Sequence, residues 1–237
     1  MSILNKFYNT PSALLIFTTL FWAFNTIFGQ LAVGEISPLQ IVPLRWILVS
    51  SVMWFLFGKD VKTNWQIIKP EINKIIFMAL MGFTGFNVLF YTASQYTNAI
   101  NLGIIQSSVP VYVLLGAYFF YKTSITALQG LGVIISIIGV TIITTNGDIE
   151  LLMTLQLNRG DLIMLVACLM YSYYTLSLKT RLQIPGIAFF TLMSVIANFL
   201  ALPLFIIDYL LNGINYPSIN GLIITMVVAI VPSSLAQ

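Results

Sequence analysis

The 237-residue sequence has no histidine, one cysteine and few charged residues. The absence of histidine removes the usual metal ligand, the usual general base and the usual proton relay within a membrane. The single cysteine, Cys168, excludes an intrachain disulfide. Charged residues make up 7% of the chain and leave a net charge of +3, which is typical of loops that face anionic lipid and does not indicate a nucleic-acid surface. We therefore expect no metal, no cofactor and no nucleic-acid partner.

Sequence motifs of hydrolytic catalysis are also missing. The chain contains no Gly-x-Ser-x-Gly elbow, no His-Glu-x-x-His and no pair of aspartates at helical spacing. An intramembrane enzyme would need a nucleophile with its base, or a metal cluster. The sequence therefore predicts that the protein is not an enzyme.

Long apolar segments dominate the chain. Hydrophobic residues make up 59% of it, and the mean hydropathy is +0.96. A helix needs about 20 apolar residues to cross the hydrocarbon core of a bilayer. This pattern predicts an all-α polytopic membrane protein with the lipid bilayer as its environment. Eight candidate spans occur, at about residues 11–33, 38–58, 73–94, 98–120, 126–145, 161–180, 186–211 and 219–236.

Basic residues gather in alternate loops between these spans. The loops on one side, together with the N-terminal segment, contain Lys6, Lys59, Lys62, Lys69, Lys74, Lys122, Lys179 and Arg181. The other side has Arg159 alone, with the acidic residues Glu35, Asp148 and Glu150 in its loops. Cytoplasmic loops retain lysine and arginine, so we expect a multi-pass protein of the cell (inner) membrane whose N-terminus is cytoplasmic.

The polar segment between the fifth and sixth spans divides the chain into two similar parts. We expect a first five-helix repeat at residues 1–145, an extracytoplasmic linker at 146–160 and a second, incomplete repeat at 161–237. Trp22–Asn25 resembles Tyr171–Tyr174, and Gly82–Asn87 resembles Ala229–Ser234. A repeat with an odd number of helices must enter from opposite sides of the membrane, and such inverted repeats form transporter sites near mid-membrane. Chance similarity between apolar helices is the alternative.

An ordered series of short stretches is similar to a known family. The chain resembles the EamA-type transporters of the drug/metabolite transporter superfamily, over essentially its whole length. The matching stretches are Leu20–Asn25, Pro38 with Arg45, Tyr91–Ala99, Ser107–Pro110, Gln129–Gly132, Gly139–Val140 and Gly160–Leu162.

The resemblance implies a ten-helix fold of two inverted five-helix repeats, with a central cavity lined mainly by helices one to four and six to nine. It also implies a protein that moves amino acids, other small metabolites or drug-like compounds across the inner membrane, often outward. Two departures matter. The chain reads Tyr121-Lys122 where the family commonly has Gly-Glu, and it ends at Gln237 with about eight helices. We therefore expect a truncated transporter.

Polar and aromatic residues inside the spans are the candidate site. Polar groups are costly in lipid, so they face a cavity or another helix, and several here share one helix face. The predicted substrate-binding residues are Trp22, Asn25, Arg45, Asn87, Tyr91, Gln106, Ser107, Pro110, Tyr171 and Tyr174. The alternatives are interhelical hydrogen bonding for the polar residues and plain packing for the aromatic ones.

Three of these features have two readings each. Arg45, the one charge well inside a span, can extend outward with its head in water, or face the cavity and attract a carboxylate or phosphate. Pro110 frees a carbonyl near Gln106 and Ser107, which can bind a polar ligand or be satisfied by neighbouring hydroxyls. The small residues Gly132, Ser136 and Gly139 indicate close helix packing in preference to a site.

The predicted function is membrane transport of small metabolites by alternating access, with export the favoured direction. No carboxylate lies in the middle of any span, and Glu35 and Asp161 fall near the outer interface, where we expect them to be solvated. This favours a facilitator or exchanger driven by the substrate gradient over proton coupling. The alternative is a non-transporting truncated fragment, or a subunit completed by another chain. A homo-oligomer is left open.

Overall fold

The computed structural model describes residues 11–144 and 158–235. All regular elements within these ranges are helices, joined by short loops. The α-helices are α2 (Pro11–Leu31), α3 (Pro38–Thr63), α4 (Trp65–Ile68), α5 (Ile72–Ala79), α6 (Phe86–Ser94), α7 (Ala99–Gln106), α8 (Val109–Tyr121), α9 (Ala127–Thr144), α11 (Arg159–Ser177), α12 (Gly186–Ala201), α13 (Pro203–Asn212) and α14 (Ile219–Ile230). Lys6, Asp148, Glu150 and most of the expected linker 146–160 lie outside the described residues.

The eight predicted spans correspond to eight helical segments. Five are long and apolar enough to cross a membrane by length and composition: Pro38–Thr63, Trp65–Ser94, Ala99–Tyr121, Arg159–Thr180 and Gly186–Asn212. The shorter apolar helices Ala127–Gly139 and Ile219–Ser233 accompany them, and α2 is the remaining segment. The prediction of an all-α polytopic membrane protein is confirmed.

Two spans contain a π-helical segment at matching places in the chain. The first, η2 (Leu80–Gly85), joins α5 to α6, and the second, η4 (Val231–Leu235), continues α14. The two paired stretches, Gly82–Asn87 and Ala229–Ser234, each overlap one of these segments in part. A π-helical turn widens the helix locally and often occurs at functional sites.

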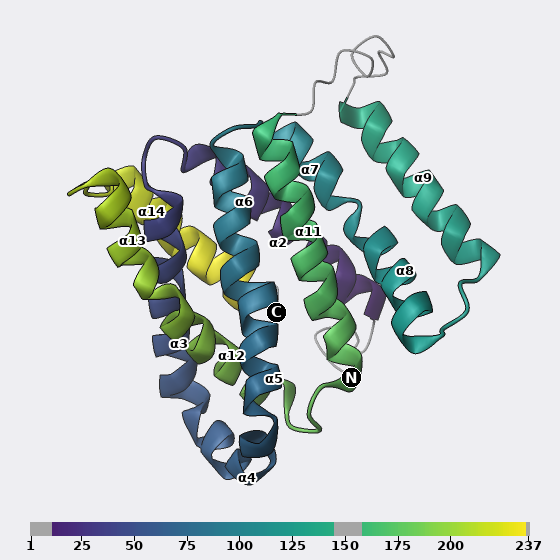
Figure 1. Cartoon of the computed structure of the whole chain (residues 1–237), viewed down its shortest axis with the longest axis horizontal. Coiled ribbons are helices and arrows are strands. Elements are labelled where there is room, and N and C mark those ends of the chain that lie inside the picture. The colour runs from purple at the N-terminus through teal and green to yellow at the C-terminus, as the bar shows by residue number, and fades with distance from the viewer. Residues whose placement is uncertain (1–10, 145–157, 236–237) are drawn as a thin grey trace.

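Contacts between helices follow a reciprocal pattern. Helix α11 packs on η2, and helix α2, which the predicted repeat pairs with α11, packs on η4. Helices α3 and α12, which the predicted repeat also pairs, pack on each other. Figure 1 shows α3, α12, α13 and α14 grouped on one side, α6 and α11 in the middle, and α9 at the far edge beyond α7 and α8.

The basic loops meet at one end of the bundle. Lys74 donates a hydrogen bond from its Nζ to the carbonyl of Thr180 at 2.6 Å. The Nζ of Lys179 lies 3.3 Å from the Thr123 hydroxyl and 4.5 Å from the centre of the Tyr121 ring. The loops α3–α5, α8–α9 and α11–α12 thus share this end, called the basic end below. Helices α3, α7, α11 and α14 begin at the opposite end.

Side-chain caps fix those four helix starts. Ser37, Asn98, Asn158 and Ser218 each accept a hydrogen bond from a backbone N–H in the first turn of the following helix. Such caps satisfy donors that have no partner within the helix. At α11 the cap is reciprocal, because the Asp161 carboxylate accepts in turn from the backbone N–H of Asn158 at 3.0 Å.

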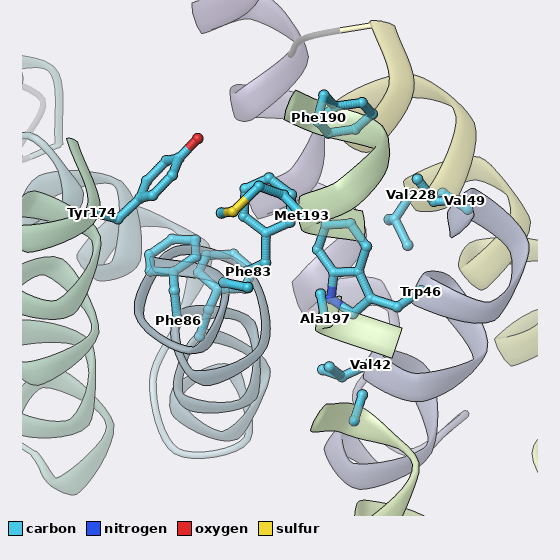
Figure 2. Packing of buried hydrophobic residues seen from close by; sticks show 14 of the residues in the cluster. Val42, Trp46, Val49, Phe83, Phe86, Tyr174, Phe190, Met193, Ala197 and Val228 are labelled. Carbon is cyan, nitrogen blue, oxygen red and sulfur yellow. The ribbon is translucent and has the colours of Figure 1, made fainter. Parts of the chain in front are cut away.

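Aromatic rings connect the halves through the centre of the bundle. The Phe83 ring, on η2, stacks on Trp46 of α3 with centroids 4.8 Å apart and planes at 11°. On its other side it meets Tyr174 of α11 at 5.6 Å. Figure 2 shows this row running from Tyr174 through Phe83 to Trp46, with Met193 of α12 beside it. The packing at the Tyr174 end of the row is tight: a Cβ added at Gly82 would collide with the Tyr174 ring.

The small-residue stripe of α9 does not pack closely on another described helix. A Cβ added at Gly132 or Gly139 meets nothing within 4 Å, and Ser136 donates its hydroxyl hydrogen to the Gly132 carbonyl at 2.8 Å. The expectation of close helix packing is wrong among the described residues, because α9 lies at the edge of the bundle and Gly132 and Ser136 are exposed there.

Gly160 and Gly139 provide a matched pair for testing packing. Gly160→Ala should destabilise the protein by about 2 kcal/mol, because the new Cβ would lie 2.7 Å from the backbone carbonyl oxygen of Ala93. Gly139→Ala should stabilise it by about 0.5 kcal/mol, because open space surrounds that helical position. Thermal unfolding in mild detergent would measure both. Equal effects of the two substitutions would contradict this account of the packing.

Candidate substrate-binding chamber

Arg45 of α3 lies at the centre of a polar cluster contributed by four spans. Its Nε donates to the Ser233 hydroxyl at 2.5 Å. Its Nη1 lies 2.8 Å from Asn87 Oδ1, 3.1 Å from the Tyr91 hydroxyl and 3.2 Å from Asn25 Oδ1. The side chain is 5% exposed. Of the two readings of Arg45, the structure therefore has the inward one.

The guanidinium group has no counter-ion in the part of the chain that the structure describes. Every group bonded to it is neutral: two amides and two hydroxyls. An uncompensated cation within a membrane protein is costly, and such residues commonly mark a substrate or ion pathway. The chain keeps this charge in place by arranging oxygen acceptors from α2, α6 and η4 around it.

Three adjoining cavities lie around this cluster. The first, about 40 Å³, is lined by Arg45, Asn25 and Asn87, among others. A second of about 490 Å³ lies between α2, α7, α8 and α11. A third of about 340 Å³ leads toward the basic end, where Arg181 lines it. Trp22 and Tyr171 line all three cavities, which together are called the chamber below.

The Trp22 and Tyr171 rings face each other inside the chamber. Their centroids are 5.5 Å apart and their planes lie at 89°, an edge-to-face contact. The sequence comparison places these residues at corresponding positions in the two halves. Residues related by a two-fold axis touch only where they lie close to that axis, so this contact agrees with the predicted pairing of Trp22 and Tyr171.

The predicted site residues come together around the chamber, with one exception. Tyr91 is buried behind it and donates to Asn25 Oδ1 at 3.1 Å. The other nine line at least one cavity: Trp22, Asn25, Arg45, Asn87, Gln106, Ser107, Pro110, Tyr171 and Tyr174. Whether they bind substrate stays a prediction.

The hydroxyls at the helix break before Pro110 bond to carbonyls other than the one that Pro110 frees. Ser107 and Ser108 donate from their hydroxyls to the carbonyls of Ile104 and Ile105 at 2.5 and 2.6 Å, whereas a proline at position 110 removes the bond to the carbonyl of Gln106. Both readings of Pro110 therefore stay predictions. Pro110 and Ser107 still line the 490 Å³ cavity, so the break shapes the wall of the chamber.

Sequence reasoning missed several residues of the site. Ser233 binds Arg45 directly, and Phe83 and Phe86 line the cavity beside it. The pairing of Gly82–Asn87 with Ala229–Ser234 was the available signal for Ser233, since it placed both stretches at equivalent depth. Arg181, at the mouth of the 340 Å³ cavity, was counted only as a topological charge.

Two carboxylates at the end opposite the basic end are buried and bonded. Asp161 is 3% exposed and accepts from the Thr97 hydroxyl at 2.7 Å. Asp208 is 2% exposed. The expectation of a solvated Asp161 is therefore wrong, because the loop residues around it supply hydrogen bonds in place of water. Neither carboxylate lines the chamber.

The helical fold, with a chamber between its spans, defines an all-α, multi-pass membrane protein. Residues 10–145, more than half of the chain, match the profile of the EamA-like transporter family. The chain belongs to this family, as the resemblance in its sequence implied.

Relatives of the chain are named as transporters. It is 30% identical over 148 residues to the uncharacterized transporter YyaM of Bacillus subtilis, which covers 62% of this chain and 48% of the relative. It is 24% identical over 201 residues to an uncharacterized transporter of Clostridium kluyveri, covering 79% of this chain and 62% of the relative. The chain thus spans about half to three fifths of these relatives. No solved structure matches it.

Proposed function

We propose that the protein to which this chain belongs transports a small polar metabolite, such as an amino acid or a drug-like compound, across the inner membrane. One observation supports this above the others: a chamber with a buried cation that has no described counter-ion, lined by the aromatic rings of Trp22 and Tyr171. An enzymatic reaction would need a nucleophile with its base or a metal cluster, and the described lining of the chamber contains neither, so transport fits the chamber better.

Alternating access would come from rocking of one five-helix repeat, residues 1–145, against a second that begins near residue 161. The reciprocal contacts of α2 with η4 and α11 with η2 support such a repeat. The gathering of lysines at the basic end supports a cytoplasmic N-terminus. In this orientation the 340 Å³ cavity lies toward the cytoplasm, and export would load substrate from there.

The exposure of one face of α2 is evidence that a further helix packs against it in the complete protein. On α11, Ser172 is buried and Leu176 lies against Gly116 of α8. The offset of 149 residues that relates Trp22 to Tyr171 makes Ala23 and Ile27 their counterparts. Both counterparts are exposed, Ile27 by 51%. We propose that a helix equivalent to α8, from the remainder of the second repeat, covers this face; a helix from another chain is the alternative.

We further propose that transport follows the substrate gradient without proton coupling. No acidic residue lines the chamber within residues 11–144 and 158–235, and a proton-coupled carrier usually has an embedded carboxylate. Flux from proteoliposomes should persist when a protonophore collapses the proton gradient while the substrate gradient is held. A collapse of flux under those conditions would show the coupling assignment to be wrong.

Trp22→Ala should test the chamber itself. Loss of the ring opens the boundary shared by the three cavities, and we expect initial flux to fall about fivefold, since an aromatic contact contributes about 1 kcal/mol. Trp65→Ala is the matched control, because Trp65 is 46% exposed on α4, away from the chamber. Equal flux in both variants would count against the chamber as the transport route.

A further inference from the structure

We propose that the chamber recognises a carboxylate group through Arg45, so that the transported molecules are small monocarboxylates. This inference rests on the proposed transport function and specifies its substrate class. It follows from three features of the described residues: an unused part of a guanidinium group, a surplus of donors around it, and the size of the adjoining space.

The guanidinium group of Arg45 retains free donors. Its Nε and Nη1 are bonded to Ser233, Asn87, Tyr91 and Asn25, whereas Nη2 has no partner among residues 11–144 and 158–235. The bonds on Nε and Nη1 hold the group in position, and they leave the two N–H groups of Nη2 for a ligand. An N–H group of a charged guanidinium makes a strong hydrogen bond to a carboxylate oxygen.

Other chamber residues also have donors without acceptors. The Gln106 carboxamide, the Tyr171 hydroxyl and the Trp22 indole N–H make no side-chain hydrogen bond within the described parts of the chain, and all three residues line the 40 Å³ cavity with Arg45. A carboxylate only accepts hydrogen bonds and offers about four lone-pair sites. A ligand group of this kind would satisfy donors that the protein itself leaves unmatched.

Charge and size narrow the ligand group further. A water-sized atom needs about 10–15 Å³ of such space, so the 40 Å³ cavity holds about three non-hydrogen atoms, the number in a carboxylate. A tetrahedral phosphate has five, and no described basic residue besides Arg45 lines this 40 Å³ cavity to match a second negative charge. The body of the ligand would occupy the adjoining 490 or 340 Å³ cavity, against the rings of Trp22 and Tyr171.

A matched set of probes tests this on the complete protein in mild detergent. The probes are 3-phenylpropionate, its uncharged amide 3-phenylpropanamide, and 2-phenylethylphosphonate, which share the phenylethyl group, with binding followed by the rise in unfolding temperature. We expect the carboxylate to bind at least about tenfold more tightly than the amide or the phosphonate. Equal binding of the three probes, tighter binding of the amide or phosphonate, or no binding of the carboxylate would overturn the proposal.

Variants then assign the preference to residues. Arg45→Gln should abolish the preference for carboxylate over amide, and Arg159→Gln, at an exposed position, should leave it unchanged. Because Arg45 also holds four spans together, Gln106→Leu provides a second variant that leaves the Arg45 bonds intact. It should reduce the preference about threefold, with Gln66→Leu on α4 as its exposed control. A preference retained by both chamber variants overturns the assignment.

Flux in proteoliposomes separates this inference from the proposed function. If 3-phenylpropionate binds with the expected preference and no carboxylate is transported, the transport function fails and the carboxylate site stands. If uncharged or cationic compounds are transported and Arg45→Gln leaves their flux unchanged, transport stands and the carboxylate site fails.

Discussion

Replacing Asp208 with alanine should lower the free energy of unfolding by about 3 kcal/mol. The Asp208 carboxylate accepts from the Ser37 hydroxyl at 2.5 Å, from Gln40 Nε2 at 2.6 Å and from Asn212 Nδ2 at 2.8 Å. It thereby joins the beginning of α3 to the end of α13. Alanine would leave these donors without their acceptor, and the penalty is largest for Gln40 Nε2, whose bond to Asp208 is buried.

Unfolding of the Asp208→Ala variant by heat or denaturant in mild detergent would measure this loss. Asp60→Ala is the matched control, because Asp60 is exposed near the other end of α3 and its loss should change stability by less than about 0.5 kcal/mol. Asp208→Asn should fall between the two, since the amide keeps one acceptor. A variant Asp208→Ala as stable as the control would mean that the buried carboxylate contributes little to holding α3 and α13 together.

The helices themselves follow directly from the sequence. Their apolar runs have the length of a membrane span, and their starts coincide with capping residues such as Ser37 and Asn158. A run of that length has few alternatives in a bilayer, because only a helix satisfies its own backbone groups there. The π-helical segments η2 and η4 were not predicted, since they depend on how neighbouring helices press on the chain.

Helical spacing also indicated the candidate site. Asn87 and Tyr91 are four residues apart and therefore lie on one helix face. Trp22 and Asn25, three residues apart, likewise share a face. What spacing does not give is the relative placement of different helices. It therefore left two directions open for Arg45, which the acceptors on α2, α6 and η4 resolve.

Hydrogen bonds between residues far apart in the chain account for the other differences between the sequence-based predictions and the structure. Asp208 bonds to residues 168 and 171 positions away, and Arg45 bonds to Ser233 across 188 positions. No local pattern encodes such pairs. A carboxylate near a predicted helix end therefore suggests solvation when the sequence is considered alone, and only the packed loops show that protein groups replace the water.

Replacing Arg45 with lysine should reduce the flux of the transported substrate about a hundredfold while the protein stays folded. Lysine keeps the positive charge, so the buried site is not deprived of its cation. Its ammonium group is a single point with three donors, whereas arginine has five donors in a fixed plane. One ammonium cannot hold both Ser233 and Asn87 in the present geometry and still offer the donors that Nη2 of arginine leaves for a ligand.

The loss would therefore arise from direction and number of hydrogen bonds, not from charge. A hundredfold change corresponds to about 2.7 kcal/mol, which is within the range for one hydrogen-bonded charged contact. Initial rates in proteoliposomes, at equal amounts of folded protein, would measure it, with Arg159→Lys at an exposed position as the control. Flux within about threefold of the unmodified protein would show that the chamber needs only a positive charge at this position. The hydrogen bonds of Arg45 to Asn25, Asn87 and Ser233 would then stabilise the packing of the four spans and would not position the ligand.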